Sequence, residues 1–76
     1  MTIPEIVRLL READGLLSGP GLRVSEFARE HGTSHKTIFR RLADLRELAG
    51  PIECGDDWLH RYTDPECRLF REETDV

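Results

Sequence analysis

Apolar residues recur at helical spacing near the start of the chain. Positions three and four apart lie on one face of a helix, and Thr2 with Glu5 three residues later forms a capping box at a helix start. A helix is therefore predicted from Ile3 to about Asp14, because Gly15 follows. Its predicted buried stripe consists of Ile3, Ile6, Val7, Leu10 and Ala13.

A short amphipathic segment follows a loop that is predicted over residues 16–21. Ser25 is a suitable N-cap, Phe27 and Ala28 provide a buried side, and Gly32 stands where a helix end requires a positive φ. The pattern predicts a second helix that stops at His31.

A longer helix is predicted over residues 34–48. Ser34 can cap it, and its apolar face repeats at spacings of four, three and four residues. That face consists of Ile38, Leu42, Leu45 and Ala49. The opposite side carries Lys36 and Arg40, flanked by Thr37 and Arg41. Cations gathered near the N-terminal half of an exposed helix face are what a helix that reads the DNA major groove needs.

A hairpin is predicted after this helix. Gly50-Pro51 ends the helix, residues 52–54 alternate as a half-buried strand, 55–57 form a turn, and 58–62 return as the second strand. Residues 22–24 can supply a short third strand. The predicted fold is a winged helix-turn-helix, mainly α, with three helices and a two- or three-stranded wing.

The helix pair and the hairpin resemble the N-terminal winged helix-turn-helix domain of DeoR-like and WYL-type bacterial transcription regulators. The resemblance spans about residues 3 to 65 and implies double-stranded DNA as the partner and a homodimer on paired half-sites. The matching residues are Phe27, Ala28, Gly32, Ser34, Thr37, Ile38, Arg40, Leu42 and Leu45, then the runs Pro51-Ile52-Glu53 and Tyr62-Thr63-Asp64-Pro65.

The distribution of charge supports this interpretation better than the total does. The chain has 76 residues and a net charge of −4, which disfavours non-specific capture of nucleic acid. Residues 34–48, however, carry four cations and two anions, whereas the remainder carries seven cations and thirteen anions. The local potential of one helix guides its docking into a groove.

Seven residues are the candidate DNA contacts. Lys36, Thr37 and Arg40 are predicted to reach base edges or the backbone, with Arg40 able to contact guanine through two hydrogen bonds. Arg41, Arg46 and Ser34 are predicted to contact phosphate. His35 could touch the backbone, make binding depend on pH, or simply be exposed. The alternative for the whole set, Ser34, His35, Lys36, Thr37, Arg40, Arg41 and Arg46, is a solvated helix face.

Other chemistry has little support in the sequence. Cys54, His60 and Cys67 lack the spacing of a zinc site, and both cysteines are interpreted as free thiols. No phosphate loop or nucleophile motif is present, so we expect neither an enzyme nor a cofactor. No apolar run approaches the roughly 20 residues of a membrane span, and no signal-peptide pattern begins the chain. We expect a cytoplasmic protein.

Two regions support rival interpretations. The acidic turn at Asp56 and Asp57, together with hairpin aromatics, favours a winged-helix module that binds protein. Trp58 is expected to be a core anchor in preference to a partner surface, and Phe39 to pack against the wing or the first helix. A DNA-binding accessory factor, such as an antitoxin or a recombination directionality factor, is a further alternative. Residues 1–63 form the expected domain, and residues 64–76 an acidic tail for dimerisation or a partner, anchored by Leu69 and Phe70.

Overall fold

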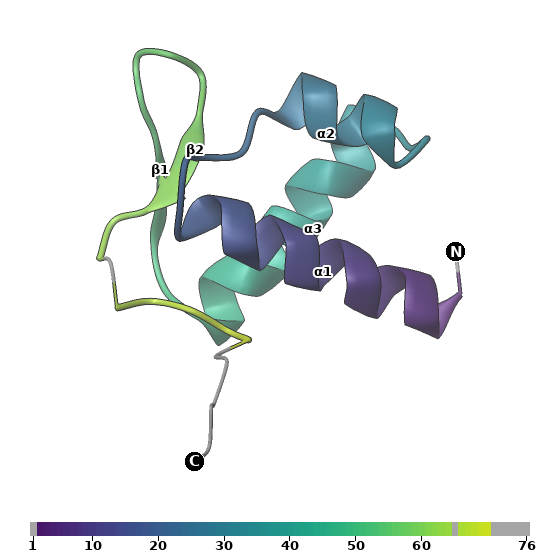
Figure 1. Ribbon diagram of the computed structural model, residues 1–76, viewed down its shortest axis with the longest axis horizontal. Coiled ribbons are helices and arrows are strands. Elements are labelled where there is room, and N and C mark those ends of the chain that lie inside the picture. The colour runs from purple at the N-terminus through teal and green to yellow at the C-terminus, as the bar shows by residue number, and fades with distance from the viewer. Residues whose placement is uncertain (1, 65, 71–76) are drawn as a thin grey trace.

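Three helices and one antiparallel hairpin make up the molecule in the computed structural model, which describes residues 2–64 and 66–70 (Figure 1). The predicted fold class is confirmed, and the arrangement is consistent with a winged helix. The elements are α1 (Ile3–Leu17), α2 (Val24–Glu30), α3 (His35–Leu48), β1 (Ile52–Cys54) and β2 (His60–Tyr62).

Helix α1 begins as predicted but ends later. Thr2 N donates to Glu5 Oε1 at 2.7 Å and Glu5 N donates to Thr2 Oγ1 at 3.4 Å, which completes the capping box. The hydrogen bond from Thr2 N, and then one from Thr2 Oγ1 at 3.0 Å, lower the pKa of the Glu5 carboxyl. The predicted end near Asp14 is wrong, because the helix continues through Gly15 to Leu17. A glycine inside a helix costs only about 1 kcal/mol, and the buried Leu17 side chain outweighs that cost.

The buried stripe of α1 is also rotated from the predicted one. Leu9, Ala13 and Leu17 are each 1% exposed, whereas Ile3 is 76% and Val7 41% exposed. The prediction was wrong for Ile3 and Val7, because the face of α1 that packs against α3 and β2 carries Leu9, Ala13 and Leu17.

Helix α2 starts without the predicted side-chain cap. Arg23 is the N-cap residue and Ser25 lies inside the helix, so the prediction of Ser25 as the cap is wrong. The end of α2 agrees closely with the prediction: Glu30 is its last residue, His31 is the C-cap, and Gly32 has φ +61°. Phe27 and Ala28 are buried as expected.

The sequence pattern of α3 is confirmed. Ser34 is the N-cap, and its hydroxyl accepts a hydrogen bond from Thr37 N at 3.2 Å. Ile38, Leu42 and Leu45 are buried. Because these three residues fix one side of the helix to the core, the opposite side must face outward.

The hairpin pairs Ile52 with Tyr62 and Cys54 with His60. Leu22 and His60 exchange two backbone hydrogen bonds of 2.8 Å, so Leu22 adds a single-residue bridge where a third strand was predicted. The second strand begins at His60 and not at Trp58, and Cys54 is exposed where the prediction had it half-buried.

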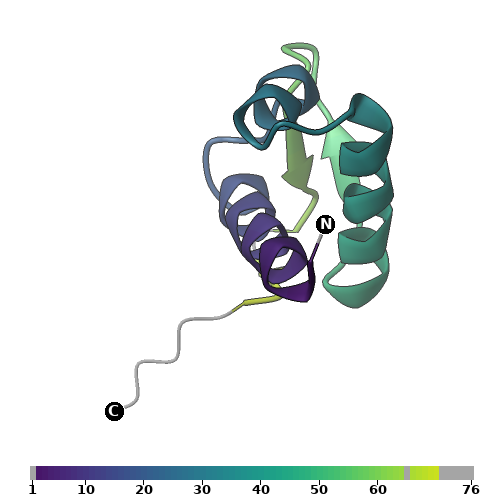
Figure 2. The same cartoon turned by 90° about the vertical axis from the view of Figure 1, so that its right-hand side faces the viewer.

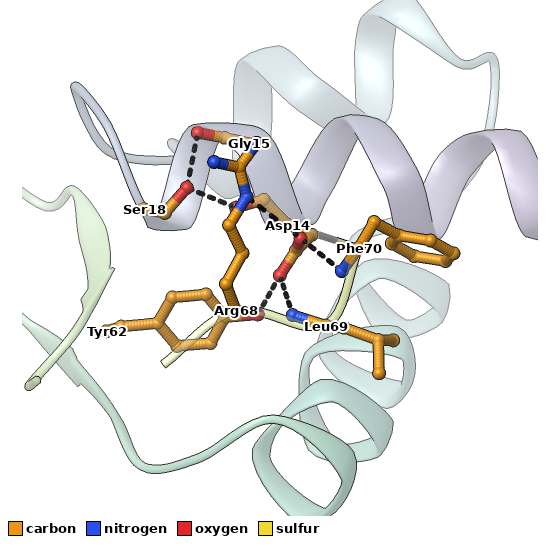
Figure 3. A network of polar contacts seen from close by, with 7 residues as sticks. All are labelled: Asp14, Gly15, Ser18, Tyr62, Arg68, Leu69 and Phe70. Atoms are coloured by element: carbon orange, nitrogen blue, oxygen red, sulfur yellow. Dashed lines mark hydrogen bonds and ion pairs between the residues drawn. The ribbon is translucent and has the colours of Figure 1, made fainter. Parts of the chain in front are cut away.

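A buried acid fastens the segment after the hairpin to α1 (Figure 3). Asp14 is 1% exposed and accepts hydrogen bonds from Tyr62 Oη at 2.5 Å, Leu69 N at 2.8 Å and Phe70 N at 2.9 Å. Arg68 Nε lies 3.7 Å from the same carboxylate. The backbone of the predicted tail anchors is therefore bound to the domain, while residues 71–76 lie outside the described residues.

The core is formed by all three helices together with Leu22 and β2. Leu69 and Cys67 pack against it from the C-terminal side. The buried apolar residues are Leu9, Ala13, Leu17, Leu22, Val24, Phe27, Ala28, Ile38, Leu42, Leu45 and Tyr62.

Candidate nucleic-acid interface

Helix α3 packs against the other elements with its apolar side, and its opposite side is open. Figure 2 shows α3 beside α1, with α2 and its connection to α3 crossing above them. The helix also meets the hairpin, where the rings of Phe39 and His60 lie edge to face with centroids 6.0 Å apart. The side of α3 that bears Lys36 and Arg40 is left facing outward.

Three cations of α3 are unpaired. Lys36 and Arg40 lie one helical turn apart, Arg46 follows in the last turn, and all three are exposed. None of the three forms an ion pair or a hydrogen bond with any residue in the described part of the chain. Their charge is therefore available to an external anion.

The residues at the start of α3 differ in exposure and in whether their side chains already form hydrogen bonds. The Ser34 hydroxyl caps the helix and lies 3.1 Å from Thr37 Oγ1, with which it shares a hydrogen bond. Thr37 is half-buried, and His35 is exposed in the first turn. The structure thus brings Ser34, His35, Lys36 and Thr37 together at one end of the helix, as the sequence indicated.

Arg41 is separated from the other candidates. Its side chain is 20% exposed, and its Nε lies 3.4 Å from Asp44 Oδ2. Nε is buried and has no hydrogen-bond partner within the described residues, so the contact with Asp44 is electrostatic only. Arg41 belongs to the flank of α3 that faces α1.

A groove of about 750 Å³ runs along that flank. Its walls come from the N-terminal half of α1, the turn between α2 and α3, and the first half of α3. The lining residues are Glu5, Ile6, Arg8, Leu9, Glu30, His31, Gly32, Thr33, Thr37, Arg40 and Arg41. Sequence reasoning missed Arg8, because no local pattern in the chain indicates that α1 and α3 share a groove.

The hairpin tip exposes the single tryptophan of the chain. Trp58 is 73% exposed, so the expectation of a core anchor is wrong. Trp58 N donates to Gly55 O at 3.1 Å and Gly55 N donates to Leu59 O at 3.0 Å, which closes a tight turn around Trp58 with its φ at +65°. A residue at the outer corner of such a turn cannot reach the core, and the neighbouring Leu59 is half-buried instead.

Cations near the tip stabilise its backbone and side chains. The Asp57 carboxylate accepts hydrogen bonds from Leu59 N at 3.1 Å and from Arg61 Nη2 at 3.2 Å. These bonds, with that from Leu59 first, lower the pKa of Asp57. Arg23 Nη2 donates to Asp57 O at 3.2 Å. The arginines at the tip are therefore already engaged, unlike Lys36 of α3.

Phe39 agrees in part with its prediction. It contacts the wing through His60, yet it is 51% exposed. It therefore lies at the border between the wing and the outward side of α3.

Metal and membrane chemistry find no site in the described residues. No group of three or more His, Cys, Asp or Glu side chains among them is placed to hold a metal ion. None of the helices in that same part of the chain has the length and apolar character to cross a membrane.

Comparison with known proteins gives no significant match to a family model, a curated protein or a solved structure. The functional interpretation therefore depends on the geometry described above and on the sequence motifs.

Proposed function

We propose that this protein is a sequence-specific DNA-binding transcription regulator of bacterial or phage type, with α3 as the helix that enters the major groove. The observation that carries the proposal is the set of three exposed cations on α3 that have no partner among residues 2–64 and 66–70, namely Lys36, Arg40 and Arg46. The helix-turn-helix order, the adjoining hairpin and the resemblance to DeoR-like and WYL-type regulators support it.

Arg40 has the chemistry for base recognition. A guanidinium can donate two parallel hydrogen bonds to O6 and N7 of guanine in the major groove. Lys36, one turn nearer the helix start, can contact a base or a phosphate. Neither side chain has an ion pair with a described residue that DNA binding would break.

The proposal also covers the oligomeric state of the protein and its location in the cell. A lone domain of this size gains affinity and specificity by binding two half-sites as a homodimer, and we propose a homodimer in the cytoplasm. Sedimentation velocity over a range of protein concentrations tests the dimer. A single monomeric species at every concentration would contradict it.

The test of DNA binding compares two double variants. The affinity is measured by fluorescence anisotropy with mixed-sequence duplex DNA. Lys36→Ala with Arg40→Ala removes two charges that attract phosphate. If each charge makes one ionic contact, the affinity at about 0.1 M salt should fall roughly sixtyfold. The matched control is Arg23→Ala with Arg61→Ala, which removes the same charge from the N-cap of α2 and from strand β2.

The control should weaken binding far less, because both of its arginines are engaged with Asp57. Equal losses for the two double variants would mean that only net charge matters and would contradict docking through α3. An absence of wild-type binding at low salt, with the protein folded, would reject the DNA-binding proposal.

A protein-binding module is the second candidate, and the exposure of Trp58 favours it. A large apolar side chain at the end of a hydrogen-bonded tip resembles the aromatic anchors of protein interfaces. In that case Trp58→Ala should abolish partner capture while Lys36→Ala with Arg40→Ala leaves it intact. An antitoxin or a recombination directionality factor would retain DNA binding, and genomic neighbourhood would distinguish these roles from transcriptional control.

A further inference from the structure

We propose that the groove between α1 and α3 is a seat for one phosphate strand of the bound duplex, and that Arg8 of α1 is a DNA contact outside the helix-turn-helix. This inference rests on the proposed DNA binding. It adds a residue and a binding surface that the sequence pattern did not indicate.

The groove lies where a phosphate strand would pass if α3 entered the major groove. Two phosphate strands border the major groove, so they pass along the two flanks of an inserted helix. One flank of α3 is covered by the hairpin, through the ring contact of Phe39 with His60. The other flank is the open groove, which is lined by Thr37 and Arg41 of α3 and by Arg8 of α1.

The cations of the groove have free donors. Arg8 is exposed and forms no ion pair or hydrogen bond within the described residues. Arg8 interacts electrostatically with the Glu5 carboxylate, which is already bonded to Thr2. Arg41 also lines the groove, and its Nε lies 3.4 Å from Asp44 Oδ2 without forming a hydrogen bond in the described part of the chain. A phosphate in the groove would give both guanidinium groups an acceptor and form charge-assisted hydrogen bonds.

Two acids line the groove, and Glu30 allows the sharper test because the Glu5 carboxylate is already bonded to Thr2. Glu30 also lines the groove, and no described residue pairs with it. A carboxylate in this place repels a phosphate strand. The proposal therefore predicts opposite signs for two substitutions in the same groove: removing Arg8 weakens DNA binding, and removing the charge of Glu30 strengthens it.

The experiment measures anisotropy with mixed-sequence duplex DNA at several salt concentrations for wild type, Arg8→Gln, Glu30→Gln and a control, Arg11→Gln. Arg11 is on the same helix one turn later, is exposed, and lies over the Phe70 ring at 5.1 Å, outside the groove. Loss of one phosphate contact lowers the affinity about eightfold at about 0.1 M salt and reduces the salt slope by about one.

We expect that loss for Arg8→Gln, a gain in affinity for Glu30→Gln, and an unchanged salt slope for Arg11→Gln. Equal effects of Arg8→Gln and Arg11→Gln, with wild-type binding intact, overturn the groove assignment and leave the proposed function standing. An absence of wild-type binding overturns both. Far-UV circular dichroism and thermal melting verify that each variant is folded.

The alternative occupant of the groove is a small free anion. In that case inorganic phosphate would shift the NMR amide signals of Thr33 and Thr37 in the DNA-free protein, while Arg8→Gln would retain full DNA affinity. That pair of results overturns the strand assignment.

Discussion

The buried cluster around Asp14 and the outward side of α3 differ in whether their charged side chains have partners within the described residues. Asp14 is 1% exposed and has donors from Tyr62, Leu69 and Phe70 around its carboxylate. Lys36 and Arg40 are exposed and have no partner in the described part of the chain. A charge surrounded by internal donors stabilises the fold, whereas one left without partners is available to a ligand.

The largest expected effect is on the buried acid. Asp14→Ala removes the acceptor of three hydrogen bonds and leaves the buried Tyr62 hydroxyl unpaired. We expect the free energy of unfolding, measured by urea denaturation, to fall by about 3 kcal/mol.

Asp44→Ala is the control for this prediction. Its carboxylate is 45% exposed and lies 3.4 Å from Arg41 Nε without a hydrogen bond, and a partly exposed ion pair of this kind contributes about 1 kcal/mol or less. Equal losses for Asp14→Ala and Asp44→Ala would mean that the Asp14 cluster does not stabilise the fold.

Removing a single donor from the cluster should cost less. Tyr62→Phe keeps the ring in the core and deletes only the hydroxyl that donates to Asp14 at 2.5 Å. Because Leu69 N and Phe70 N still donate hydrogen bonds to the carboxylate, we expect the free energy of unfolding to fall by about 2 kcal/mol. In Asp14→Ala, the further change Tyr62→Phe should cost much less, since the hydroxyl has no acceptor there. Full additivity in this double-mutant cycle would contradict the coupling.

The same tyrosine predicts a dependence of stability on alkaline pH. Burial, and then the hydrogen bond to Asp14, raise the pKa of Tyr62 above its ordinary value. The folded state therefore favours the protonated phenol, so this stability is complete below the unfolded pKa of about 10 and is lost as the pH rises above it. Tyr62 is the only tyrosine, and near-ultraviolet absorbance of tyrosinate thus reports on it alone.

At a pH near 10 the native protein should contain less tyrosinate than the urea-unfolded protein. The alkaline loss of stability should be smaller in Tyr62→Phe. A native titration curve that coincides with the unfolded one would show that the hydroxyl is not protected.

The same contrast explains what the sequence could predict. Local patterns gave the helix order, the Ser34 cap, the positive φ of Gly32 and the buried face of α3, because each depends on residues close together in the chain. Six of the seven DNA candidates lie on α3, and Ser34 is its N-cap. Their contact with DNA stays a prediction.

Contacts between distant segments could not be predicted in this way. Asp14 looked like the last residue of a helix, yet its partners lie 48 to 56 residues away. Arg8 joins the groove only because α1 packs beside α3, and Trp58 is exposed because of hydrogen bonds within its turn. The packing of α3 and β2 on α1 also decided which of its apolar residues are buried.

The smallest expected effect on stability concerns the cations of α3. Lys36 and Arg40 are four residues apart on a helix, where like charges repel by about 0.2–0.5 kcal/mol, and alanine has the highest helix propensity. Lys36→Ala with Arg40→Ala should therefore leave the melting temperature unchanged or slightly raised, although it should weaken DNA binding strongly. Thermal unfolding followed by far-UV circular dichroism, on the protein samples used for anisotropy, measures this. A clear loss of stability would mean that these cations stabilise the fold as Asp14 does, and the distinction between the two regions would then be wrong.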